Sequence, residues 1–174
     1  MLSHWSIDCA GPFPADPETG DVYVILAVEW LSRWPEARAS KKIDAPAIAD
    51  FIYHNICCWY GIPESFRTNH GSGFDNQVME NLTETLRINH HRSTPYYPQS
   101  NGLVELLVQT FKNSLKRTIM DQIHSTEGLE NEPSPHWAHL VDSLLYAYCC
   151  TPYLATSVSF AMLLFGQHLK LQGG

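Results

Sequence analysis

The sequence is short of basic residues. Its 174 residues include 11 Lys and Arg against 18 Asp and Glu, a formal net charge of −7 with the histidines neutral. Proteins that hold DNA through a broad electrostatic surface normally carry a basic face, so this composition argues against that mode of binding. No apolar run approaches the roughly 18 residues of a membrane span, and Asp8 interrupts the first apolar stretch, unlike a signal-peptide core. We therefore expect an intracellular location and no membrane partner.

The sequence also lacks the usual frameworks for disulfides and for zinc. Its cysteines are odd in number, form two adjacent pairs and show no C-x-x-C spacing; they are Cys9, Cys57, Cys58, Cys149 and Cys150. We expect them to be small apolar side chains that stay reduced. His136 and His139 lie one helical turn apart, but without a third ligand nearby we interpret them as a surface pair.

What the sequence does contain is the pattern of one globular α/β domain, which we assign to residues 1–174. Hydrophobic residues make up 44% and charged residues 17%. Strands are predicted over 4–10, 22–28, 33–40, 63–68 and 88–93. Helices are predicted over 44–61, 76–87, 103–123, 136–150 and near 158–165, with an acidic connector over 124–135. This order predicts helices packed on a mixed sheet, and Pro35 predicts that 33–40 is an edge strand, since proline cannot donate to a ladder.

Two of the predicted helices have recognisable ends or buried stripes. Asp44 is expected to cap the first helix, with Pro46 in its first turn and Gly61 at its end. Its apolar positions recur at helical spacing: Ile48, Phe51, Ile52, Ile56 and Trp59. The stripe predicted for 136–150 contains Trp137, Leu140, Leu144 and Tyr148.

Three polar positions stand out against this background. Asp8 lies within an apolar strand, Asn69 precedes a Gly-Ser-Gly turn after a later strand, and Glu105 lies in the first turn of the long helix, after a Pro-Gln-Ser-Asn-Gly loop. Each has an ordinary explanation by itself, as a polar strand position, a loop residue, or a carboxylate that suits the helix dipole. Their order, with 35 residues between positions 69 and 105, makes a shared site the stronger hypothesis.

The whole set of blocks resembles the catalytic core of retroviral and long-terminal-repeat retrotransposon integrases, most closely the gypsy class. The family signature is Asp, then Asp, then Glu after 35 intervening residues. The matching blocks are WSIDCAGPF (5–13), SRWPEA (32–37), WYGIPESF (59–66), GSGF (71–74), STPYYPQSNGLVE (93–105) and LLFG (163–166). They keep the family's order and cover nearly the whole chain.

The resemblance implies a ribonuclease H-like fold, a five-stranded mixed sheet flanked by helices. It also implies phosphodiester hydrolysis and strand transfer with two Mg2+ or Mn2+ ions, because hard divalent cations need charged oxygen ligands. The catalytic positions would be Asp8, Asn69 and Glu105, with Asp8 and Glu105 as metal ligands. DNA would be a partner, a homodimer would form through helices, and the location would be nuclear.

The sequence departs from the family at the second catalytic position, where Asn69 replaces aspartate. Losing one unit charge about 4 Å from a cation, at an effective dielectric near 20, costs roughly 4 kcal/mol, or about a thousandfold in rate. Neither Glu64 nor Asp75 is expected to reach the site in its place, so metal binding should be weak or absent. Leu106, Tyr97, Cys149 and Phe160 are further departures from the family's usual residues. Together they suggest a degenerate, domesticated retroelement.

We therefore expect an integrase-core-like nucleic-acid-binding domain that is catalytically impaired. Lys112, Lys116 and Arg117 are spaced along the long helix, and Tyr96 and Asn101 lie in the preceding loop, so these five are the predicted nucleic-acid-binding residues. The three basic residues could equally form an ordinary solvated helix face. Two alternatives remain: an active metal-dependent polynucleotidyl transferase for DNA integration, and a structural or dimerisation module that binds no nucleic acid.

Overall fold

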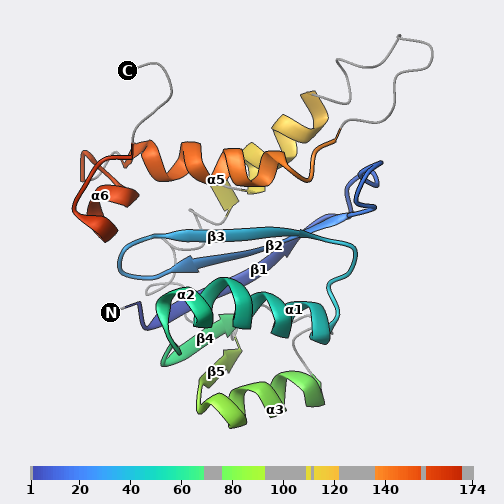
Figure 1. Cartoon of the computed structure of the whole chain (residues 1–174), viewed down its shortest axis with the longest axis vertical. Helices are drawn as coiled ribbons and strands as arrows, with labels where there is room; N and C mark the ends of the chain where they lie inside the picture. The colour runs from blue at the N-terminus through green and yellow to red at the C-terminus, as the bar shows by residue number, and fades with distance from the viewer. Residues whose placement is uncertain are drawn as a thin grey trace.

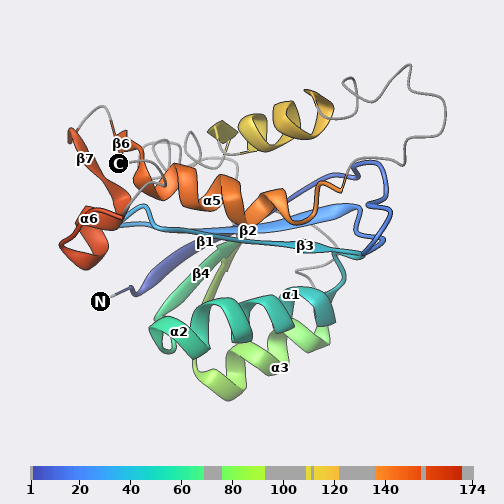
Figure 2. The same cartoon turned by 45° about the horizontal axis from the view of Figure 1, so that its top comes forward.

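The protein is a three-layer α/β domain with a five-stranded sheet in the middle. The computed structural model describes residues 2–68, 76–92, 109–110, 112–121, 136–153 and 156–169. In Figure 2 the sheet is seen nearly edge-on, with α1, α2 and α3 on one side and α5 and the helical residues 109–110 and 112–121 on the other. Within the described ranges, no helix is long and apolar enough to cross a membrane.

The sheet has the strand order β3-β2-β1-β4-β5, which puts β1 in the centre (Figure 1). Its strands are β1 (His4–Ala10), β2 (Tyr23–Glu29), β3 (Pro35–Ser40), β4 (Ser65–Thr68) and β5 (Asn89–Arg92). β1 pairs antiparallel with β2 and parallel with β4, so the sheet is mixed. This confirms the predicted fold class, and β3 is the edge strand that Pro35 predicted.

The helices follow the predicted order, with differences at their ends. They are α1 (Ala45–Phe51), the π-helix η1 (Ile52–Cys57), α2 (Cys58–Tyr60), α3 (Gln77–Leu86), α5 (Leu140–Cys150) and α6 (Phe160–Phe165). Residues 109–110 and 112–121 are helical, in agreement with the long helix predicted there. A short hairpin of β6 (Pro152–Tyr153) and β7 (Val158–Ser159), which the sequence did not predict, precedes α6.

Each face of the sheet has its own hydrophobic core. β2 contributes to both, because six of its seven residues are buried, as expected of a continuous apolar run. One core, against α1, η1 and α3, includes Trp5, Ile7, Ile48, Phe51, Ile52, Ile56, Phe66 and Met79. The other, against α5 and the long helix, includes Val24, Leu26, Val28, Leu115, Ile119, Trp137 and Val141.

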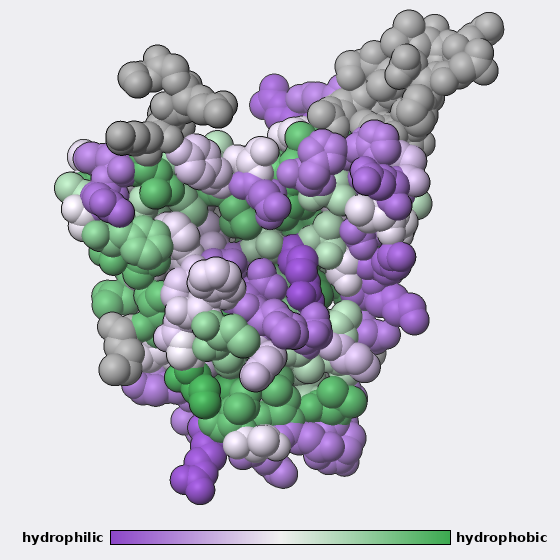
Figure 3. Space-filling view, viewed as in Figure 1, coloured by the Kyte–Doolittle hydropathy of each residue, from purple (hydrophilic) through white to green (hydrophobic). Residues whose placement is uncertain are grey.

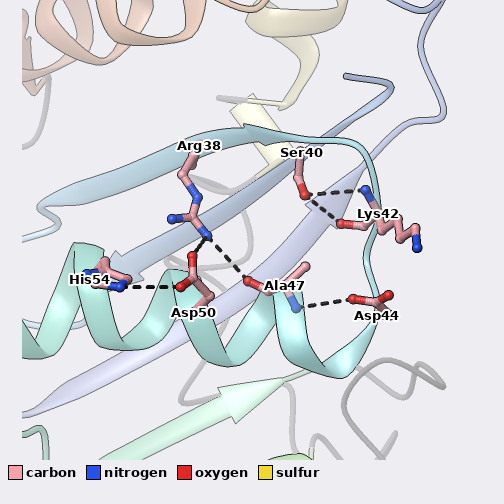
Figure 4. Close-up of polar contacts among 7 residues, drawn as sticks. All are labelled: Arg38, Ser40, Lys42, Asp44, Ala47, Asp50 and His54. Carbon is pink, nitrogen blue, oxygen red and sulfur yellow. Dashed lines mark hydrogen bonds and ion pairs between the residues drawn. The ribbon is translucent and has the colours of Figure 1, made fainter. Parts of the chain in front are cut away.

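Polar contacts cap the start of α1 and join the helix to the edge strand β3 (Figure 4). Asp44 caps the helix as predicted, accepting a hydrogen bond from the Ala47 backbone N–H at 3.1 Å. Arg38 on β3 reaches across to Asp50, with 2.9 Å between Nη2 and Oδ2, and His54 lies 3.3 Å from the other Asp50 oxygen. α1 is thus held against β3 by side chains as well as by its apolar face.

One member of the predicted buried stripes is wrong. Trp59 is 79% exposed, because the i→i+5 bonding of η1 changes the angular spacing on which the stripe rested. In α5, Leu140, Leu144 and Tyr148 pack against the core as predicted but are only partly buried, and the fully buried positions are Val141 and Cys149. Trp137 is buried as predicted, but it precedes the helix, which begins at Leu140.

Candidate active site

Asp8 lies on the central strand, facing away from the core formed by its neighbours. Ile7 is buried against α1 and its surroundings, whereas the Asp8 side chain is 21% exposed on the opposite face. This is the face on which the long helix packs. β1 therefore places Asp8 where the strand meets that helix.

The Asp8 carboxylate is engaged on both oxygens. Oδ1 accepts a hydrogen bond from the Cys9 backbone N–H at 2.8 Å, and Oδ2 lies 2.5 Å from Nζ of Lys112. Lys112 belongs to the long helix, 104 residues further along the chain, and its side chain is also 21% exposed. An ion pair this sheltered is screened less by salt than a surface pair. The sequence predicted both residues at a site but did not predict this contact.

The chain turns sharply just after Asp8, and a glycine permits it. Gly11 has φ +127°, a conformation that favours glycine, and a Cβ there would lie 2.7 Å from the Val22 carbonyl oxygen. In the sequence, the Gly-Pro-Phe motif shortly after Asp8 is the feature that indicates this turn. The loop that begins here forms one wall of the site.

This loop is anchored to the start of α5 by Asp16. The side chain is only 2% exposed; its Oδ1 accepts from the Glu18 and Thr19 backbone N–H groups, and its Oδ2 from that of Ala138, each at 3.0 Å. Burial alone would raise the pKa of Asp16, but these hydrogen bonds outweigh it and lower the pKa. Trp137 adds a second tie, donating from Nε1 to the Pro14 carbonyl at 2.7 Å. Residues 12–21 are rich in Pro, Asp and Gly, a composition typical of a turn, but it does not indicate this anchor.

A cavity of about 430 Å3 lies between this loop and the long helix. One wall is the segment Cys9–Pro14. The other is formed by Gln109, Lys112, Asn113, Lys116 and Met120. We call this cavity the β1–helix groove. Lys112 and Lys116 both line it, whereas Arg117 is 85% exposed and lies beside Asp121, with 3.9 Å between the charged groups. Two of the three predicted basic residues are therefore brought together.

The other predicted site residues lie outside the described part of the chain. These are Asn69, Tyr96, Asn101 and Glu105. The last described pair between β1 and β4 is Ile7 with Thr68, the residues immediately before Asp8 and Asn69. The described parts of β1 and β4 therefore run side by side in the same direction as far as this pair. If Asp8, Asn69 and Glu105 share metal ions, their carboxyl or amide carbons should lie within about 8 Å of one another, and this stays a prediction.

The described residues do not by themselves form a divalent-cation site. Among them, no three His, Cys, Asp or Glu side chains are grouped closely enough to hold a metal ion. Asp8 offers one carboxylate, and Lys112 already contacts it. Cys9 is no substitute ligand, because burial, with a smaller contribution from Asp8, raises the pKa of its thiol to about 12.

Other candidate ligands are placed elsewhere. Glu64 lies at the start of β4, where its carboxylate is 4.0 Å from His4 at the far end of β1 from Asp8, so it does not replace an acid at position 69. His136 and His139 are exposed, as predicted, with ring centroids 6.3 Å apart. All five cysteines are free.

Comparison with known proteins agrees with this geometry. The chain is 26% identical over 149 residues to the Gag-Pol polyprotein of avian reticuloendotheliosis virus and 27% identical over 150 residues to that of feline leukemia virus. Each alignment covers 86% of the chain but only 12% and 8% of the relative. The catalytic core domain of BIV integrase superposes with a TM-score of 0.65 at 20% identity, covering 95% of this chain and 96% of that one. The chain is a retroviral integrase core-like domain.

This result confirms the recognised family and the ribonuclease H-like fold. No family model matches the chain. A third relative, the Pol polyprotein of feline endogenous virus ECE1, is 30% identical over 118 residues, which is 68% of the chain and 11% of the relative. The chain spans only about a tenth of the length of these relatives. The gypsy affinity and the domesticated origin remain predictions.

Proposed function

We propose that this integrase core-like domain binds nucleic acid in the β1–helix groove and is catalytically impaired. The observation that supports it best is the meeting of Asp8 and Lys112. It brings Asp8, the first position of the family signature, against the long helix, on which the third position is predicted to lie. The fold and the retroviral relatives support the same interpretation.

Nucleic-acid binding would be local in this protein. With a net charge of −7, attraction to phosphate depends on where the few cations lie. Lys112 and Lys116 line one groove, beside polar Gln109 and Asn113, which can donate hydrogen bonds to phosphate or sugar oxygens. Two phosphate contacts predict a shallow salt dependence, with a slope of log K against log salt of about −2.

Catalytic impairment follows from the charge available for divalent ions. Asn69 supplies a neutral amide where the family has a carboxylate, and the carboxylate of Asp8 is neutralised by Lys112. Two ions that share one phosphate require more negative charge than this, since bound Mg2+ is normally neutralised by carboxylates and phosphates. Mg2+ or Mn2+ would provide electrostatic stabilisation of the reacting phosphate if the missing charge were restored.

The binding part of the proposal is tested with a charge-matched pair of double variants. Lys112→Gln/Lys116→Gln should weaken binding of a short fluorescent DNA duplex at least tenfold in anisotropy titrations. Lys41→Gln/Lys42→Gln, which removes the same charge from exposed positions between β3 and α1, should weaken it less than threefold. Equal losses in both variants would mean diffuse attraction and would contradict binding in the groove.

The impairment is tested by restoring the carboxylate. The unmodified protein should show no cleavage of a DNA duplex with Mg2+ or Mn2+, and Asn69→Asp should gain measurable cleavage. If Asn69→Asp binds the metal and stays inert, the damage extends to other positions such as Leu106 and Tyr97. Cleavage by the unmodified protein that Glu105→Gln abolishes would instead establish the alternative, an active polynucleotidyl transferase.

We also propose that two copies pair through their helices. Large apolar side chains are exposed on α2, on α6 and between α2 and β4. They are Trp59 at 79%, Phe165 at 51% and Ile62 at 59%. Figure 3 shows hydrophobic surface gathered along the side occupied by α6 and in a band across the lower part of the same face, above its polar lower edge. Sedimentation velocity should detect a dimer in the unmodified protein and a weaker one in Trp59→Glu. Unchanged association in that variant would contradict pairing through this surface.

A further inference from the structure

The one carboxylate described at the site already has a cation of its own. Nζ of Lys112 lies 2.5 Å from Oδ2 of Asp8, and the other carboxylate oxygen accepts the Cys9 backbone N–H. Both side chains are about four-fifths sheltered, at 21% exposure each. An ammonium group can donate three hydrogen bonds, and here one is directed at the oxygen that a metal ion would need.

We propose that Lys112 is the resident counter-ion of Asp8 and competes with divalent cations for it. This inference rests on the proposed function of the same site. A divalent ion could bind Asp8 only after Lys112 moves away, and the lysine would still repel the ion from the groove wall. Among the described residues of the site, Lys112 balances the negative charge of Asp8.

The pair compensates the charge of Asp8 from within the fold. Neutralising Asp8 from within the fold avoids leaving a sheltered carboxylate uncompensated, which is costly. The pair also joins the central strand to the long helix and so fixes the width of the β1–helix groove. Lys112 therefore acts as a positioning residue at Asp8 as well as a candidate phosphate ligand.

The test is a Mn2+ titration in the absence of nucleic acid, followed by water-proton relaxation. Lys112→Gln keeps a side chain of similar reach without the charge. Removing one unit charge beside the ion should tighten Mn2+ binding on the order of tenfold. Lys116→Gln is the matched control, since it removes the same charge from the same groove. Among the described residues, Lys116 has no carboxylate partner. The Mn2+ affinity of Lys116→Gln should therefore change less than twofold. Asp8→Asn/Lys112→Gln should lose the gain.

Thermal melting gives a second readout that does not depend on measurable affinity. In the absence of metal, Lys112→Gln should melt below the unmodified protein, and Mn2+ should raise its melting temperature more than that of the unmodified protein. If Lys112→Gln binds Mn2+ no more tightly and gains no more thermal stability from it, the proposal is wrong. Cleavage of DNA by the unmodified protein would contradict the proposed impairment but would leave this comparison to decide the role of Lys112.

Discussion

Replacing Asp16 by asparagine would remove the tie between the groove wall and α5 with almost no change in shape. The carboxylate accepts three backbone N–H groups, two from its own loop and one from Ala138, 122 residues away. An asparagine side chain has one oxygen and one NH2 group. Its NH2 group would therefore face a backbone N–H that the second carboxylate oxygen now accepts. We expect the Ala138 contact to be lost, because one amide oxygen can still serve both N–H groups of the loop.

The magnitude follows from the burial of Asp16, which is 2% exposed. A hydrogen bond to a charged group contributes about 1.5–3 kcal/mol, and a buried donor left unpaired costs about 1–3 kcal/mol. The loss of the hydrogen bond and the cost of the unpaired donor partly overlap. We therefore expect Asp16→Asn to lower the free energy of unfolding by about 2–3 kcal/mol. For a chain of this length that corresponds to a melting temperature roughly 5–10 °C lower.

Urea denaturation at pH 7 would measure this loss, with Glu18→Gln as the control. Glu18 is in the same loop, but its side chain is 74% exposed, so its loss of charge should matter little. The pKa of Asp16 is lowered by folding, so its stabilisation is present above the ordinary aspartate pKa of about 3.9 and is lost as the pH falls through the lower folded value. The difference in free energy of unfolding between the unmodified protein and Asp16→Asn should therefore stay constant from pH 5 to 8 and narrow only below about pH 4. A loss no larger than that of Glu18→Gln, or a gap that widens in acid, would refute this reasoning.

Two further predictions concern the glycine turn and a sheltered glutamate. Gly11→Ala should lower the free energy of unfolding by at least about 2 kcal/mol, because its Cβ would lie 2.7 Å from the Val22 oxygen at a φ of +127°; a melting temperature close to that of the unmodified protein would contradict this. Burial raises the pKa of Glu36, more than the hydrogen bonds from Tyr60 and Trp34 lower it. The unmodified protein should therefore lose stability relative to Glu36→Gln as the pH rises above about 4.3, as measured by urea midpoints from pH 4 to 8. A difference that does not vary with pH would show that Glu36 is not held at a raised pKa.

The elements that the sequence predicted correctly are those specified by neighbouring residues. The apolar run of β2, the proline that makes β3 an edge strand, and the cap at Asp44 act within a few residues of where they stand. The order of these elements was enough to predict a mixed sheet covered by helices. The motif blocks identified the family independently of packing.

The errors arose where the geometry depends on more than local spacing. The stripe that included Trp59 assumed an uninterrupted α-helix, and the π-helix η1 changes the direction of the residues after it. The start of α5 was predicted at residue 136, but the helix begins at Leu140. Trp137 is buried before the helix begins, and its indole N–H donates to the Pro14 carbonyl on a distant loop. Neither feature has a signature within a short window of sequence.

For the site, the sequence alone supplied the candidate residues: an acid at Asp8, a neutral amide at Asn69 and lysines on the long helix. Only the tertiary structure decided that Asp8 meets Lys112 across 104 residues and that Asp16 holds the groove wall to α5 across 122. Contacts at such separations depend on how the central strand, the loop and the helix pack together. Residue identity fixes what each side chain can donate or accept, whereas packing selects which partner it finds.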